Sequence, residues 1–247
     1  MMCSCCRRLA AIVAALLCAA FLIGCVARVS GVGPLVVKYQ AQQSPLACQS
    51  AAVSMLLDYL GRPADQAVVF EALASMGGHA AHSSRVAYLC ERLPDKNPRF
   101  LYVQDPDEAW HILNDSLARG FPVLLSTRIT PGGHVILVIG TEVQRGRQWV
   151  IAHDPAGEFD FDAAEFVGSG EAVRYRFRDL FVRNRQLMVS DAEPPRWESW
   201  IVGTREWIPI GSNAEPGARV HQIVTDWEML VISPDEQCDL RSRQDPE

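Results

Sequence analysis

The hydrophobic pattern of this chain changes character near Gly120, and that change restricts the folds open to it. Before Gly120, apolar residues recur every three or four positions, which is the spacing of helices with one buried face. After Gly120, short apolar and β-branched runs alternate with turn-forming residues, which is typical of antiparallel strands. Helices followed by strands predict an α+β domain in which N-terminal helices pack on an antiparallel β-sheet.

The ends of the individual elements carry their own signals. Ser44 and Asp105 are expected N-caps because each is followed by a proline, which fits the first turn of a helix. The helices are expected to cover about 44–60, 63–76, 84–92 and 105–120. Strands are expected at Leu35–Tyr39, Phe100–Val103, Pro122–Ser126, His134–Ile139, Trp149–Ala152 and Tyr175–Phe177, with shorter ones near Trp200–Thr204 and Met229–Ser233.

The N-terminus reads as an export signal. Arg7 and Arg8 precede an apolar run from Leu9 to Gly24, which is the order of a signal peptide. The run ends in Leu22-Ile23-Gly24-Cys25, which resembles the bacterial lipobox, in which the Cys is lipidated and becomes the mature N-terminus. An uncleaved anchor is the alternative, because the run is nearly long enough to span a bilayer. Either reading predicts a globular part anchored on the extracytoplasmic side, in the periplasm or at the cell surface.

Four segments follow from these signals. Residues 1–24 are the predicted signal peptide with lipobox, and residues 25–35 are small and Gly-rich, as in a tether. Residues 36–190 form the expected main domain. Glu193-Pro194-Pro195 reads as a linker, so residues 191–247 are predicted to be a C-terminal add-on with a disordered end.

Charge and cysteine usage exclude some functions. The net charge is −6 and no basic cluster occurs, which argues against a nucleic-acid partner. Outside the signal, Cys25 is the predicted lipid carrier, and Cys48, Cys90 and Cys238 remain. Three thiols cannot all pair, so at least one stays free. Cys90 is either a core residue or the partner of Cys238 in a disulfide, which an exported chain permits.

Cys48 is the first candidate for chemistry. It stands near the start of a predicted helix, where unpaired N–H groups and the helix dipole favour a thiolate. Gln42 lies six positions upstream in the loop that approaches the helix, so its amide and the Cys48 N–H could hold an oxyanion. A lone helical Cys is more often a small buried residue, so Cys48 needs support from elsewhere in the chain.

That support comes from the strands. His134 follows two glycines at the start of a very apolar strand, where it is accessible to a cleft. Asp154 ends the next strand, so pairing of the two strands would bring Asp154 beside His134 and allow it to orient the imidazole. His153 is the weaker candidate, because strand side chains alternate and it points to the other face.

These residues carry a family resemblance. The segments Gln42-x5-Cys48, Leu57-x-Tyr59-x-Gly61, Gly120-x-Pro122-Val123, Gly133-His134-Val135 and Asp154-Pro155 resemble the papain-like cysteine peptidases related to the bacteriocin-processing double-glycine-leader peptidases, over about residues 36–182. The resemblance implies Cys48 as nucleophile, His134 as base, Asp154 as its orienting carboxylate and Gln42 in the oxyanion hole. It implies a peptide or protein substrate and no cofactor. It departs from the family pattern at Gln49, where a Gly commonly follows the nucleophile.

Other readings stay open. A catalytically silent peptide-binding lipoprotein and a cell-wall peptidoglycan hydrolase of the same Cys-His chemistry are the alternatives to a cysteine peptidase. His79 and His82 share a Gly-rich loop, but no third ligand is indicated nearby, so no metal site is expected. The absence of a Gly-x-Ser-x-Gly elbow argues against a serine hydrolase.

Overall fold

The computed structural model describes residues 30–78, 81–130, 132–180, 183–190, 193–201, 206–211, 223–234 and 238. The helices are α2 (Cys48–Tyr59), α3 (Gln66–Ser75), α4 (His82–Arg92) and α5 (Pro106–Ala118), with a 3-10 turn η1 (Phe177–Leu180). The strands are β1 (Asn97–Val103), β2 (Val123–Thr127), β3 (His134–Gln144), β4 (Arg147–His153), β5 (Glu158–Asp160), β6 (Glu165–Val167), β7 (Val173–Arg176), β8 (Arg183–Ser190), β9 (Glu193–Ile201), β10 (Glu206–Gly211) and β11 (Ile223–Ser233).

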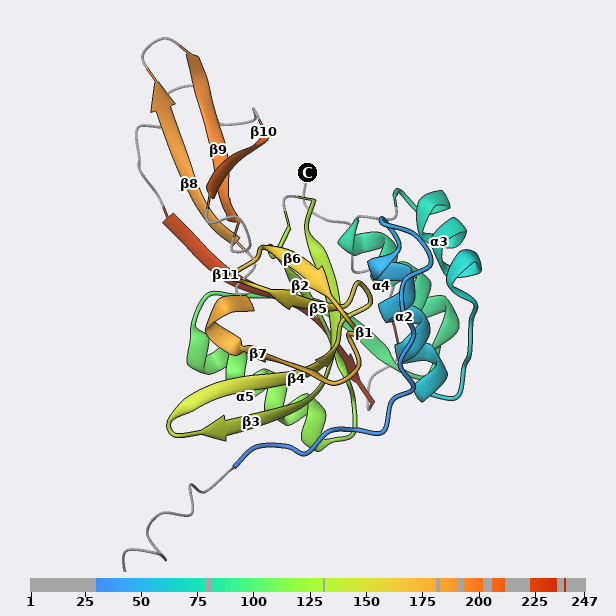
Figure 1. Cartoon of the computed structure of the whole chain (residues 1–247). Coiled ribbons are helices and arrows are strands. Elements are labelled where there is room, and N and C mark those ends of the chain that lie inside the picture. The colour runs from blue at the N-terminus through green and yellow to red at the C-terminus, as the bar shows by residue number, and fades with distance from the viewer. Residues whose placement is uncertain are drawn as a thin grey trace, which may run out of the picture.

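One antiparallel sheet organises the domain. Its strands run in the order β10-β9-β8-β11-β2-β3-β4-β7 (Figure 1). The first residues of β11, 223–226, pair with β8, and the rest of β11, from Trp227 to Ser233, pairs with β1. Helices α2, α3 and α4 cover one face of this sheet and α5 covers the other, so each face has its own hydrophobic cluster. The predicted α+β arrangement, with N-terminal helices on an antiparallel sheet, is confirmed.

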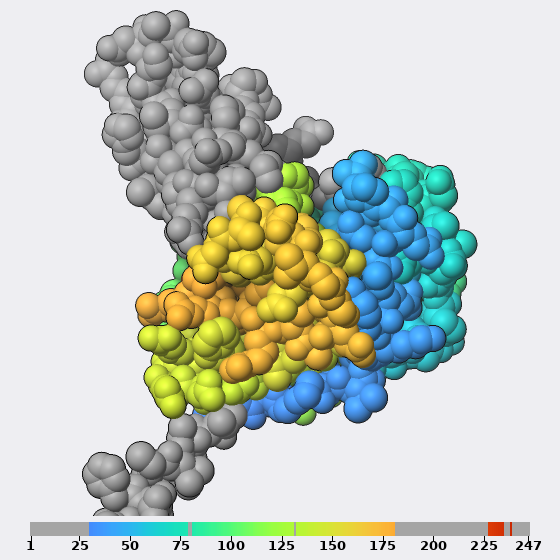
Figure 2. Space-filling model, in the orientation of Figure 1, coloured from blue at the N-terminus to red at the C-terminus, as the bar shows by residue number. Residues whose placement is uncertain are grey.

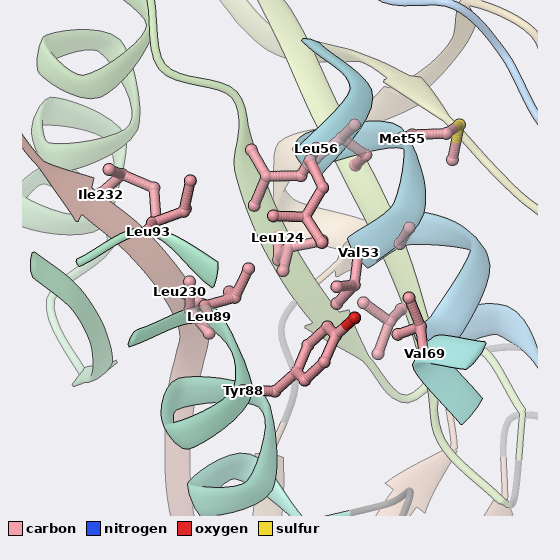
Figure 3. Packing of buried hydrophobic residues seen from close by; sticks show 14 of the residues in the cluster. Val53, Met55, Leu56, Val69, Tyr88, Leu89, Leu93, Leu124, Leu230 and Ile232 are labelled. Atoms are coloured by element: carbon pink, nitrogen blue, oxygen red, sulfur yellow. The ribbon is translucent and has the colours of Figure 1, made fainter. Parts of the chain in front are cut away.

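The cluster beneath α2, α3 and α4 joins segments that are far apart in the sequence. Leu56 on α2 and Leu89 on α4 are fully buried against Leu124 of β2 and Leu230 of β11 (Figure 3). Burying side chains of this size stabilises the fold by about 1.5–3 kcal/mol each before the entropy of ordering them is counted. This packing fixes the start of α2 relative to the edge of the sheet.

Two expected elements differ from the structure. Leu35–Tyr39 is not a strand, because the Val37 N–H bonds the Leu35 carbonyl two residues back and only Leu35 bonds β3 here, through Ile139. The helix expected from Ser44 begins at Cys48 instead, because residues 44–47 form a turn closed by the Ala47 N–H and the Ser44 carbonyl. The remaining helices lie within a few residues of their expected ends.

The tether prediction also needs correction. Residues 30–35 are hydrogen-bonded along β3, through Ser30 to Val143, Val32 to Thr141 and Leu35 to Ile139. This part of the segment is therefore attached to the domain. The rest of the predicted tether, the signal peptide and the lipobox with Cys25 lie outside the described residues. In the portions of the chain that are described, no helix is long and apolar enough to cross a bilayer.

The segment predicted as an add-on is tied to the main sheet. The expected linker at Glu193-Pro194-Pro195 is the start of β9, and β8, β9 and β10 pair with one another as antiparallel strands. Strand β11 then enters the centre of the sheet between β1 and β2. Cys238, just beyond it, forms a disulfide with Cys90 on α4, which settles the alternative left open for Cys90. The predicted disordered end lies outside the described residues.

Candidate active site

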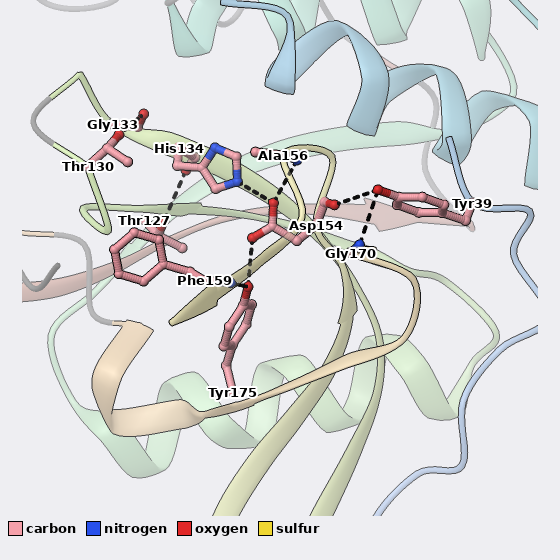
Figure 4. Close-up of polar contacts among 10 residues, drawn as sticks. All are labelled: Tyr39, Thr127, Thr130, Gly133, His134, Asp154, Ala156, Phe159, Gly170 and Tyr175. Atoms are coloured by element: carbon pink, nitrogen blue, oxygen red, sulfur yellow. Dashed lines mark hydrogen bonds and ion pairs between the residues drawn. The ribbon is translucent and has the colours of Figure 1, made fainter. Parts of the chain in front are cut away.

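His134 is held at the first position of β3 by the turn that precedes it. Gly133 has φ of 79°, a conformation that L side chains rarely adopt, so this turn requires glycine. The Thr130 hydroxyl donates to the Gly133 carbonyl at 2.9 Å, and the Thr127 hydroxyl donates to the His134 carbonyl at 3.3 Å (Figure 4). The His134 side chain is therefore fixed in direction where the strand begins.

Asp154 is the fully buried partner of His134. The pairing of β3 with β4 brings the two residues to the same edge of the sheet, as the sequence predicted. His134 Nε2 lies 2.6 Å from Asp154 Oδ1, which also accepts the Ala156 N–H at 2.9 Å. The Tyr175 hydroxyl donates to Asp154 Oδ2 at 2.9 Å (Figure 4). A buried carboxylate is costly unless it is paired and hydrogen-bonded, and Asp154 meets both conditions.

Cys48 is the first residue of α2, half-buried, and the free cysteine of the described chain. Burial raises the pKa of its thiol. The hydrogen bond to His134, the charge of His134 and the N–H groups of Val135 and Gln49 outweigh that effect, so the pKa lies below its usual value. The sulfur thus has cationic and N–H partners that favour the thiolate.

The pKa of His134 shifts in the opposite direction. Burial lowers it, but the charge and hydrogen bond of Asp154, together with those of Cys48, raise it to about 10. Because Nε2 is engaged by Asp154, the hydrogen bond to Cys48 uses Nδ1. A lowered thiol pKa beside a raised imidazole pKa favours a thiolate–imidazolium pair at neutral pH.

Gln42 lies on the loop that joins the N-terminal segment to α2. Its backbone N–H donates to the Pro155 carbonyl at 2.8 Å, which places it beside the residue that follows Asp154. Its side-chain oxygen is buried and accepts no hydrogen bond from the described residues, so this oxygen is not committed to holding the fold. The loop itself is held by Gln66 of α3, whose Nε2 donates to the Ala41 carbonyl at 2.9 Å.

Sequence reasoning missed several residues that support the pair of His134 and Asp154. Tyr175 was placed on a strand, but its bond to Asp154 depends on the pairing of β7 with β4, which no local pattern reveals. Phe166 on β6 packs its ring 5.1 Å from the His134 ring. The Tyr39 hydroxyl donates to the Asp154 carbonyl at 3.1 Å and so joins the strands to the loop before α2. In Figure 2 the yellow and orange surface formed by the segment after β4 meets the blue surface before α2.

The remaining sequence candidates have other roles. His153 is a buried bridge, because its Nε2 bonds the Val37 carbonyl at 2.8 Å and its Nδ1 accepts the Ala172 N–H at 3.1 Å. His82 begins α4 and pairs with Glu228, and His79 lies outside the described residues. No group of three or more metal-ligating side chains occurs within the described ranges.

Comparison with known proteins then decides the class. Residues 34–169 match the family model described as "Peptidase_C39 like family", and the match covers more than half of the chain. The chain belongs to the Peptidase_C39 like family. The resemblance to papain-like peptidases predicted from the sequence is confirmed. As a member of this family the protein is a cysteine peptidase, a hydrolase, with the papain-like combination of helices and antiparallel sheet.

Two solved structures are among those similar to this chain. One is a double glycine motif protease from an AMS/PCAT transporter, crystallised with the leader peptide, at 15% identity and a TM-score of 0.39 over 59% of this chain and 84% of that one. The other is UfSP from C. elegans, at 13% identity and a TM-score of 0.43 over 86% of this chain and 35% of that one. No curated protein matches the sequence of this family member significantly.

Proposed function

We propose that this Peptidase_C39 like protein is an exported, membrane-anchored cysteine peptidase with a Cys48–His134–Asp154 triad and a Gln42 oxyanion hole. The observation that carries the proposal is the buried pair of His134 and Asp154, 2.6 Å apart, hydrogen-bonded through the imidazole to a free cysteine at a helix start. Membership of the family supports a peptide or related amide as the substrate.

The proposed reaction uses the charges of the resting site. The Cys48 thiolate attacks the carbonyl carbon. The oxyanion that forms accepts hydrogen bonds from the backbone N–H of Cys48 and from the side-chain amide of Gln42. The C–N bond then breaks as the His134 imidazolium gives its proton to the leaving amine. Neutral His134 next takes a proton from water, whose oxygen attacks the thioester and releases the acid and the Cys48 thiolate. Asp154 holds His134 in position throughout.

Export is supported by two independent features of the chain. The segment from Arg7 to Cys25 has the order of a signal peptide with lipobox. The disulfide between Cys90 and Cys238 is a bond that persists in oxidising compartments outside the cytosol. We propose that Cys25 carries the lipid and becomes the mature N-terminus. Membrane fractionation of wild type and Cys25→Ala, with mass analysis of the mature N-terminus, tests this step. A membrane-bound protein that starts at Met1 would favour the uncleaved anchor.

Thiol labelling tests the triad without knowledge of the substrate. With the disulfide oxidised, iodoacetamide should label Cys48 rapidly at neutral pH, because a thiolate is the reactive form. His134→Ala should slow labelling at least tenfold, since the imidazolium no longer stabilises the thiolate. His111→Ala is the matched control, because His111 is exposed on α5 away from the site.

Gln42→Ala separates the oxyanion role from thiol activation. It should leave labelling nearly unchanged but lower turnover of a fluorogenic peptide amide by roughly 10²–10³. The labelling rate of Asp154→Ala should fall between those of His134→Ala and Gln42→Ala, because Asp154 acts only through the imidazole. Slow labelling of Cys48 that is unaffected by His134→Ala would contradict the triad and leave a silent peptide-binding protein as the better reading.

A further inference from the structure

A second group of polar side chains lies on the face of the sheet that α2 and α4 cover, and three of its members, Arg85, Ser126 and Glu228, are buried. Tyr102, Glu228 and Ser126 are aligned partners on β1, β11 and β2, so their side chains share one face. His82 and Arg85 reach this row from α4. We call these five residues the Arg85 cluster. The neighbouring buried side chains are apolar, so the buried charges of Arg85 and Glu228 are unusual in this packed interior.

Arg85 is the central charge of the cluster. It is 1% exposed, its Nη1 donates to the Ser126 hydroxyl at 3.1 Å, and its guanidinium carbon lies 5.4 Å from the centre of the Phe100 ring. Glu228 is also buried, at 3% exposed. A buried cation is expensive unless a negative charge faces it, and Glu228 supplies that charge.

The cluster extends to the nucleophile. Ser126, which accepts the hydrogen bond from Arg85, is the β2 partner of Val135 on β3. The Val135 N–H in turn bonds the sulfur of Cys48. One packed cluster contains Val135 and the apolar side chains of α4, and Cys48 packs against it. Because Arg85 is also on α4, Arg85 and Cys48 approach the sheet from the same side. His134 reaches Cys48 from the strand side, where Asp154 lies.

Electrostatics agrees with this placement. Burial lowers the pKa of Arg85 to about 10, while the charges of Glu228, Cys48 and Tyr102 raise it. The guanidinium therefore stays charged at neutral pH and feels a negative charge on Cys48. The charged and titratable groups that face Arg85 are His82 on its own helix, Cys48 on α2, Tyr102 on β1 and Glu228 on β11.

We propose that Arg85 is a positioning residue whose buried positive charge favours the Cys48 thiolate from the helical side, and that Glu228 limits how strongly this charge acts. The inference rests on the proposed function, because it assumes that the Cys48 thiolate is the nucleophile. It adds a second cation to the one that His134 provides.

The alternative is that the charges of Arg85 and Glu228 serve only to stabilise the fold. A structural role predicts that removing either Arg85 or Glu228 weakens the fold and disturbs the site in the same direction. An electrostatic role predicts opposite effects on the thiol, because one variant removes a positive charge and the other removes a negative one. The sign of the effect therefore separates the two readings even if both variants lose stability.

The experiment measures the rate of iodoacetamide alkylation of Cys48 against pH in full-length protein with its disulfide intact. Arg85→Gln should raise the apparent pKa of the thiol by about 0.5–1 unit, which is a threefold to tenfold slower reaction below that pKa. Glu228→Gln should lower it by a similar amount. The double variant Arg85→Gln/Glu228→Gln should return to within about 0.3 unit of wild type, because the two charge changes cancel.

Two controls accompany these variants. Arg92→Gln removes the same charge from an exposed position at the end of α4 and should leave the profile unchanged. Repeating the measurement in His82→Gln shows which part of the profile belongs to titration of His82. Shifts of the same sign in the two single variants, or no shift in either, would overturn the role of Arg85.

The outcome also remains distinct from that of the proposed function. If Cys48 reacts rapidly and depends on His134, but Arg85→Gln and Glu228→Gln do not move its pKa in opposite directions, only the further inference fails. If Cys48 reacts slowly whether or not His134 is present, the triad itself fails and the role of Arg85 falls with it.

Discussion

Tyr175→Phe removes a single oxygen that makes two buried hydrogen bonds. The Tyr175 hydroxyl donates to Asp154 Oδ2 at 2.9 Å and accepts the Phe159 N–H at 2.8 Å, and the residue is 2% exposed. The burial of the phenol and the nearby Asp154 charge raise the Tyr175 pKa, so the hydroxyl remains a donor at all ordinary pH values. The substitution leaves the ring in place, so it tests the hydroxyl alone.

The expected loss of stability follows from the two groups left behind. The Phe159 N–H and one oxygen of Asp154 each lose a partner in the interior, and a buried group left unpaired costs about 1–3 kcal/mol. We therefore expect the free energy of unfolding to fall by about 2–6 kcal/mol. Asp154 keeps its bonds to His134 and Ala156, so it should still orient the imidazole, less firmly. Turnover of a fluorogenic peptide amide should fall by roughly tenfold, the equivalent of about one hydrogen bond.

Tyr59→Phe is the matched control for Tyr175→Phe. The Tyr59 hydroxyl donates to the Gly120 carbonyl at 3.0 Å in a half-buried place outside the site. Its loss should cost no more than about 1.5 kcal/mol and leave turnover unchanged. Urea unfolding and turnover are measured on both variants. If Tyr175→Phe is as stable and as active as Tyr59→Phe, the hydroxyl does not support Asp154 and the reasoning is wrong.

Three further predictions rest on other contacts. The value of kcat/KM should rise with pH through the lowered pKa of Cys48 and fall again near the pKa of His134, about 10, because thiolate and imidazolium must coexist. A profile without the upper limb would contradict the imidazolium. Gly170→Ala should lower Tm, since a Cβ there would overlap a backbone carbonyl oxygen, whereas Gly33→Ala, with nothing within 4 Å, should not. Cys90→Ser should lower the free energy of unfolding by about 2–5 kcal/mol, because the disulfide closes a loop of 148 positions. A reductant should then no longer change the stability of the variant.

The strand half of the site was predictable because its contacts are local. His134 and Asp154 end two consecutive strands joined by a short turn, and consecutive antiparallel strands usually pair. The ends of two paired strands must lie close together, so the sequence alone placed the imidazole and the carboxylate side by side. The predicted helix start near Cys48 is likewise a local signal, although the structure moves it from Ser44 to Cys48 itself.

The supporting residues were not predictable, because their contacts depend on the order of strands in the sheet. Tyr175 reaches Asp154 only because β7 lies beside β4, and Glu228 lies opposite Ser126 only because β11 inserts next to β2. Strand β11 comes from the segment predicted to be an add-on, since nothing in its local pattern reveals that it pairs with β1, more than 120 positions earlier. Pro194 and Pro195 favoured a linker by composition, but β9 includes them beside a shift in its register with β8.

The start of α2 leaves its first N–H groups available to the Cys48 sulfur. The N-cap is Ala47, which has no side-chain oxygen and makes no capping bond, and the first turn contains no acidic residue. The first N–H groups of a helix need an acceptor, and Ser, Thr, Asp or Asn usually supplies it. Here the sulfur of Cys48 accepts the Gln49 N–H, so in the proposed thiolate form a negative sulfur would take the place of the missing cap. A better cap at position 47 would stabilise the helix but compete with the thiolate for the same donors. The helix start therefore sacrifices about 0.5–2 kcal/mol of capping, and the unused donors favour the charged sulfur.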